Sequence, residues 1–129
     1  MTYVSVPKKR KKESMGVRQV EKRESARHRK FVRSRECIAH GAFGIFCEGP
    51  IQFCHVRSGL PEGEQAGVSQ KPHDAFGFPA CAYHHKRQHD MGEASFEQLY
   101  GVNLLETALA LSLQSPDLEL RAKARSIRT

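Results

Sequence analysis

Residues 81–89 read CAYHHKRQH, a stretch in which cysteine and histidine recur at short intervals. Cys81 and His84 are separated by two residues, so one tight turn can present both side chains to the same ion. His85 and His89 are four positions apart and lie on one face if the stretch is helical. The stretch therefore predicts a helix that begins at a metal-binding turn and carries a pair of imidazoles further along.

A second C-x2-H pair, Cys37 and His40, lies upstream, and Cys47 is followed by a glycine that favours another tight turn. Such turns supply the four ligands of a closed tetrahedral zinc site, and a small domain with a modest core needs this support. The five candidate ligands for this structural Zn²⁺ are Cys37, His40, Cys47, Cys81 and His84. The spacing alone does not decide which four of them hold the ion. The alternative is a set of buried cysteines beside a capping histidine, which the repeated C-x2-H spacing disfavours.

The segments around these ligands predict a small α+β fold. Residues 51–56 and 76–80 read as short apolar strands, and the glycines and prolines between them indicate a long loop. Two short strands are unstable alone in water, so the metal ligands lie where a clamp between strands and helix is needed. Helices are expected at 81–91, 93–100, 104–113 and 117–128.

Positive charge is concentrated in the first part of the chain. Residues 1–35 hold 13 Lys and Arg and 3 acidic residues, a net charge of +10, whereas residues 36–129 have a net charge of −3. A basic arm beside a mildly acidic domain indicates a nucleic-acid partner, because Lys and Arg neutralise phosphates. The alternative is a solubilising tail or one attracted to an anionic membrane. We expect contacts to DNA from Lys8, Lys9, Arg10, Lys11 and Lys12.

Composition divides the chain into four parts. We expect a disordered basic arm at 1–16, a basic helix at 17–36, a metal-bound domain with packing helices at 37–116, and a charged C-terminal helix at 117–129. The chain has no long apolar segment and no apolar leader, so the sequence predicts an intracellular protein without a membrane partner. In a reducing compartment, its four cysteines are better interpreted as metal ligands than as disulfides.

Cys54 and His55 lie near the end of the first predicted strand. Side chains alternate along a strand, so the two can reach one ion only if the strand ends or bulges there. The His55 imidazole can accept a proton from water, and Arg57 can hold a phosphate. Taken alone, His55 is interpreted as a satisfied core histidine, and its role depends on the pattern of the whole chain.

Together, the stretches CEGPIQFCHVR (47–57), QKPHD (70–74) and CAYHHKRQH (81–89) resemble HNH, or ββα-metal, endonucleases with an embedded structural zinc site. The resemblance covers residues 37–91, and more narrowly the pattern is similar to that of small HNH nucleases carried by phages and prophages. It implies a ββα-metal core with flanking helices and hydrolysis of phosphodiester bonds in DNA. It also implies a bacterial cytoplasm or a phage-infected host cell, and no small-molecule substrate.

The resemblance assigns roles to individual residues. His55 corresponds to the general base, and His85 and His89 correspond to ligands of one catalytic divalent ion, for which Zn²⁺, Mn²⁺, Ni²⁺ and Mg²⁺ stay open. The chain departs from the family pattern because the middle asparagine is missing, and Asp74 is the nearest residue to that position. The third ligand of the ion is Cys54, Asp74 or water.

A non-catalytic, zinc-stabilised DNA-binding module is the second function that the pattern allows. The zinc site and the basic arm serve such a module equally well. It has no need, however, for three histidines outside the zinc ligands, namely His55, His85 and His89. A protein whose histidines sense metal or pH is a third interpretation, without further support in the chain. The pattern predicts neither the oligomeric state nor the DNA specificity.

Overall fold

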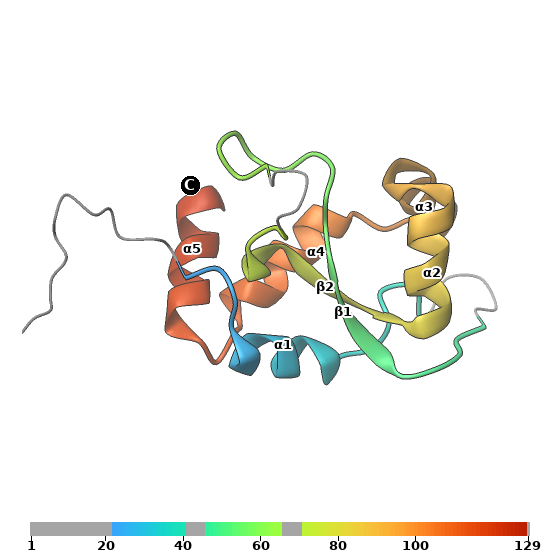
Figure 1. The fold of residues 1–129 in the computed structure, drawn as a ribbon, viewed down its shortest axis with the longest axis horizontal. Helices are drawn as coiled ribbons and strands as arrows, with labels where there is room; N and C mark the ends of the chain where they lie inside the picture. Colours follow the sequence, from blue (N-terminus) through green and yellow to red (C-terminus); the bar gives the residue numbers. More distant parts are fainter. Residues whose placement is uncertain (1–21, 41–45, 66–70, 129) are drawn as a thin grey trace, which may run out of the picture.

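Figure 1 shows the fold in a computed structural model, which describes residues 22–40, 46–65 and 71–128. Within these ranges the protein is a small α+β fold of one two-stranded sheet and five α-helices. The small α+β class predicted from the sequence is therefore confirmed. The elements in chain order are α1 (Ala26–Arg33), β1 (Ile51–His55), the short 3-10 helix η2 (Asp74–Phe76), β2 (Gly77–Cys81), α2 (Ala82–Met91), α3 (Glu93–Tyr100), α4 (Leu104–Leu113) and α5 (Leu118–Arg128).

The two strands pair antiparallel over their full length. Ile51 faces Cys81 and His55 faces Gly77, so the sheet joins two segments that both carry candidate site residues. β2 passes into α2 without an intervening loop, which gives the order strand, strand, helix. The bounds of β1, β2 and α2 each lie within one residue of the bounds predicted from the sequence.

The core lies where β2 meets the C-terminal helices. Phe76, Phe78, Phe96 and Leu104 are all fully buried, and each such side chain contributes about 1.5–3 kcal/mol by leaving water. Helix α4 packs on β2 and η2, and α5 packs on α4. In Figure 1, α2 and α3 lie on the opposite side of the sheet from α5. None of the helices within the described ranges is long and apolar enough to cross a membrane.

The basic helix is shorter than predicted. Instead of covering 17–36, it spans Ala26–Arg33 within the described residues. Ser25 caps it by accepting a hydrogen bond from the backbone N–H of His28, and its own backbone N–H donates to Asp74. This second bond holds Ser25 in an extended conformation, so the helix cannot continue toward the N-terminus.

Two other predictions concern the chain ends. The charged C-terminal helix expected at 117–129 is present as α5 (Leu118–Arg128), and Asp117 precedes it. The Asp117 carboxylate accepts from Ser25 Oγ and from the backbone N–H of Glu119, which ties α5 to the start of α1. The arm at 1–16, with the five residues expected to contact DNA, lies outside the described residues.

Candidate metal centre and active-site pocket

Four ligand candidates from distant parts of the chain meet at the start of α2. Their donor atoms all lie within 4.8 Å of one another, and we call this set, Cys37, Cys47, Cys81 and His84, the Cys3His group. The three Sγ atoms lie 3.5, 3.8 and 3.2 Å, in chain order, from Nδ1 of His84. A tetrahedral zinc with Zn–S of about 2.3 Å and Zn–N of about 2.0–2.1 Å separates sulfur and nitrogen by about 3.5–3.6 Å. The group can therefore hold a metal ion, and its spacing fits zinc.

His40 is the candidate that the Cys3His group leaves out. Its side chain is 59% exposed, and its Nε2 lies 3.7 Å from the carboxylate of Glu36. The C-x2-H turn does form, because the backbone N–H of His40 donates to the carbonyl of Cys37. Only the cysteine of that turn points toward α2, and Cys47 occupies the fourth place.

The turn after Cys47 is held against the start of α2. The backbone N–H of Ala82 donates to the carbonyl of Pro50, which brings the two backbones together. Gly49 has a φ of +85°, and a Cβ at this position would lie 2.6 Å from the Cβ of Ala82. Only glycine satisfies both conditions, so it allows Cys47 to reach the other ligands.

The thiols of the Cys3His group need a compensating positive charge to ionise together. Burial raises the pKa of Cys37. Burial, followed by the nearby thiols of Cys37 and Cys81, raises the pKa of Cys47 to about 12. Burial and then the charge of Arg87 lower the pKa of His84, which favours the neutral imidazole. A divalent cation bound by the group would supply the missing charge, because metal binding displaces the thiol protons.

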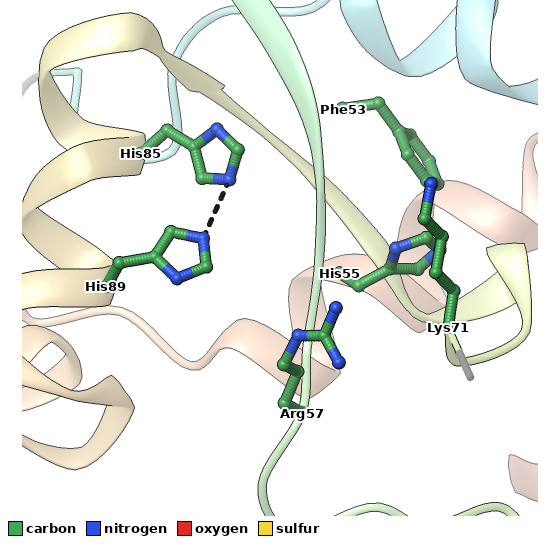
Figure 2. A pocket seen from close by; sticks show the side chains of 6 residues that line it. All are labelled: Phe53, His55, Arg57, Lys71, His85 and His89. Carbon is green, nitrogen blue, oxygen red and sulfur yellow. Dashed lines mark hydrogen bonds between the residues drawn. The ribbon is translucent and has the colours of Figure 1, made fainter. Parts of the chain in front are cut away.

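A second group of candidates lines an open pocket of about 230 Å³ beside β1. Figure 2 shows the histidine pair of α2 on one side of β1 and Phe53, His55 and Lys71 on the other, with Arg57 between the two groups. The structure thus brings together two groups that the sequence indicated separately, His55 with Arg57 and His85 with His89. The pocket is lined by these four, Phe53 and Lys71.

His55 is held by a buried carboxylate. Its Nε2 lies 2.9 Å from Oδ1 of Asp74, whose side chain is fully buried. The ionised carboxylate can only accept, so the hydrogen bond places the imidazole proton on Nε2. In the neutral imidazole, Nδ1 of His55 then keeps its lone pair, and this tautomer can act as a general base through Nδ1.

Asp74 is fully engaged by its neighbours. Besides His55, it accepts from Nε and Nη2 of Arg29, at 2.6 and 2.9 Å, and from the backbone N–H of Ser25, at 2.8 Å. Burial by itself would raise the pKa of Asp74, but the hydrogen bonds from His55, Arg29 and Ser25 outweigh burial and lower the pKa to about 2. Asp74 therefore stays ionised and fixes the orientation of His55.

His85 and His89 direct their Nε2 atoms at one another, 3.2 Å apart (Figure 2). Two nitrogen ligands at about 2.0–2.1 Å from one tetrahedral ion are separated by about 3.3–3.4 Å. The pair therefore has the spacing of two ligands that share an ion. Burial and then the neighbouring His89 lower the pKa of His85, which favours the neutral form that binds metals.

Neither residue expected as a third protein ligand lines this pocket. Cys54 is 1% exposed and belongs to the core, because strand alternation turns it away from His55. Both oxygens of Asp74 are occupied by other donors. Within the described ranges, the Cys3His group is the only set of three or more such ligands close enough to share an ion. The structure therefore does not place Cys54 or Asp74 with the histidine pair as a third ligand.

Comparisons of the chain with protein-family models, with curated proteins and with solved structures gave no match.

Several residues of the pocket were not indicated by the sequence. Phe53 and Lys71 line it, and Gln52 contacts His85. The ring of Phe53 lies against Gly77, where a Cβ would come within 2.1 Å of the ring. An isolated lysine, glutamine or phenylalanine has no characteristic spacing, so no local pattern could have identified these residues. Only the neighbouring strand and helix give them a role.

A carboxylate of α3 sets the position of Arg57. Glu93 accepts the backbone N–H groups of Arg57 and Ser58, at 2.8 and 2.9 Å. The side-chain amide of Gln88 donates to the same carboxylate at 2.9 Å. The chain leaving β1 is therefore anchored to the α2–α3 corner, with Arg57 at the edge of the pocket.

Proposed function

We propose that this protein is a metal-dependent endonuclease of the HNH kind, which hydrolyses phosphodiester bonds in DNA. In this proposal β1, β2 and α2 form the ββα-metal core. The observation that carries it is the pocket in which a carboxylate-held His55 and the His85–His89 pair lie together with Arg57. A hydrolase acting on a phosphodiester needs a base, an electrophile and a phosphate anchor, and these residues can supply all three.

His55 acts as the general base. With its Nε2 proton held by Asp74, it accepts a proton from water through Nδ1. Arg57 and Lys71 line the same pocket and hold the phosphate oxygens by charge-assisted hydrogen bonds. His85 and His89 would hold the divalent ion, which would supply Lewis-acid stabilisation of the negative charge on the phosphorus centre and the leaving oxygen. The two imidazoles suit Zn²⁺, Mn²⁺ or Ni²⁺ better than Mg²⁺, which prefers oxygen ligands.

We assign structural zinc to the Cys3His group. Its four donors come from three separate segments, so a bound ion cross-links the loop after α1, the turn before β1 and the start of α2. Its closed set of protein ligands leaves no open position for a substrate. The ion therefore stabilises the fold and sets the position of α2, which carries the histidine pair.

DNA is the partner that the charge distribution favours. The first 35 residues have a net charge of +10, and the described helix α1 still exposes Arg27, Lys30 and Arg33. A non-catalytic zinc-stabilised DNA-binding module would use the same charges. The buried Asp74–His55 hydrogen bond favours the enzyme, because a binding module gains nothing from a histidine whose tautomer is set by an ion-paired carboxylate.

A plasmid-nicking assay tests the proposal. Zinc-loaded full-length protein is incubated with supercoiled DNA and Mn²⁺, Ni²⁺, Zn²⁺ or Mg²⁺ in turn. His55→Ala should abolish nicking while DNA affinity and melting temperature stay close to wild type, because the base acts in the transition state. His40→Ala is the matched control, since His40 is exposed and belongs to neither site. A wild-type protein that binds DNA but nicks it with none of these ions would favour the binding module instead.

A further inference from the structure

Gln52 holds the nitrogen of His85 that faces away from the histidine pair. Its Oε1 lies 2.6 Å from Nδ1 of His85, whereas Nε2 of His85 faces His89 at 3.2 Å. An amide oxygen can only accept, so this contact places the imidazole proton on Nδ1. Nε2 of His85 is then unprotonated and has its lone pair directed at the place where an ion would be shared.

The two histidines of the pair carry their imidazole protons on different nitrogens. Because Nε2 of His85 carries no proton, the hydrogen bond between the two Nε2 atoms must be donated by His89. To bind an ion through Nε2, His89 gives up that proton, whereas His85 already has the required tautomer. His85 is therefore the preset ligand of the pair, and Gln52 is what presets it.

The acceptor lies on a rigid element. Gln52 is the second residue of β1 and pairs with Ala80 of β2, so its backbone is fixed by the sheet. His55 lies three positions after Gln52 on the same strand, and its hydrogen bond to Asp74 sets its tautomer. One strand thus carries both the general base and the residue that sets the first metal ligand.

We propose that Gln52 is a positioning residue for the catalytic ion, which it serves by holding His85 as an Nε2 ligand. The inference rests on the proposed metal site at His85 and His89. Partners that accept the second N–H of a metal-binding histidine fix the ring and raise its basicity, and their loss typically weakens metal binding by about 10- to 100-fold. Gln52→Leu should therefore weaken binding at the histidine pair by about this factor. Gln52→Glu, which keeps an acceptor, should bind at least as tightly as wild type.

Nickel titration of the zinc-loaded, full-length protein measures this effect by calorimetry. Elemental analysis after the titration verifies that zinc stays in the Cys3His group of each variant. Gln98→Leu repeats the substitution at an exposed position of α3 and should leave the nickel affinity unchanged. Equal nickel affinity in wild type and Gln52→Leu would overturn the inference. Equal affinity in wild type and His85→Ala would instead overturn the proposed metal site, and with it the role of Gln52.

Nitrogen-15 NMR of the histidine side chains provides a readout that does not depend on nickel or on cleavage. In the nickel-free protein, His85 of wild type and of Gln52→Glu should be protonated at Nδ1. In Gln52→Leu the proton should redistribute toward Nε2, because the acceptor is gone. A wild-type His85 protonated at Nε2 would overturn the inference even if nickel binds at the pair.

Discussion

Replacing Asp74 with asparagine tests the link between the fold and the general base. Asparagine keeps the shape of the side chain but loses the charge and one of the two acceptor oxygens. In the native protein Asp74 accepts from His55, from two nitrogens of Arg29 and from the backbone of Ser25. At least one of these donors would then face an NH₂ group. We therefore expect Asp74→Asn to lower both the stability and the rate of cleavage.

The pKa of Asp74 sets the size of the loss. A fully buried carboxyl whose pKa falls from 3.8 to about 2 on folding stabilises the folded state at neutral pH by about 2 kcal/mol. Donors left without an acceptor in the variant increase this loss, so we expect Asp74→Asn to lower the free energy of unfolding by about 2–5 kcal/mol in total. The charge-dependent part is present above the unfolded pKa of 3.8 and disappears as the pH falls toward 2. The difference between wild type and variant should therefore be constant from about pH 8 to pH 5.

Urea unfolding of the zinc-loaded proteins, followed by circular dichroism, measures this difference. A double-mutant cycle with Arg29→Met isolates the ion pair, whose coupling energy should exceed about 0.5 kcal/mol because the two side chains are in contact. Nicking should fall more in Asp74→Asn than in Arg29→Met, since only Asp74 contacts His55. An Asp74→Asn variant within about 0.5 kcal/mol of wild type at neutral pH would refute the reasoning.

Three further predictions concern the Cys3His group, His28 and Arg33. Chelating the metal, or Cys81→Ser, should unfold the described domain because metal binding supplies folding free energy; a metal-free protein with unchanged circular dichroism and melting temperature would contradict this. The pKa of the fully buried His28 is lowered from 6.5 to about 4, chiefly by burial. The free energy of unfolding should therefore keep its full value above pH 6.5 and fall by about 3 kcal/mol as the pH drops toward 4. His28→Gln should reduce this dependence of the unfolding free energy on pH, measured by urea titration. An unchanged dependence on pH would exclude His28 as its source. Arg33 lies one turn after Arg29, on the flank of α1 next to Phe53. Arg33→Gln should therefore lower the slope of log DNA affinity against log salt by about the value of one phosphate contact. Arg27→Gln, on the opposite flank, should change this slope less. Identical salt slopes for these two variants would exclude this flank of α1 as a phosphate contact.

The sequence by itself determined the secondary structure of the described domain, part of the Cys3His group and the spacing of the histidine pair. Apolar periodicity and the positions of glycine and proline placed β1, β2 and helices α2 to α5 within one residue, because such signals act over a few residues. The same locality holds for Cys81-x2-His84 and for His85-x3-His89. The extent of α1 was predicted less well, because a hydrogen bond from Ser25 to the distant Asp74 helps decide where it begins.

Only the tertiary structure decided which residues complete these groups. Cys37 and Cys47 approach His84 from 47 and 37 positions away, and no local spacing distinguishes Cys47 from His40 as the fourth ligand. Asp74 was expected near the histidines, but its engagement with His55, Arg29 and Ser25 follows from the docking of α1 and η2 on the sheet. Contacts of this range depend on how the loops close and which side chains exclude water, and the order of residues along the chain does not specify either directly.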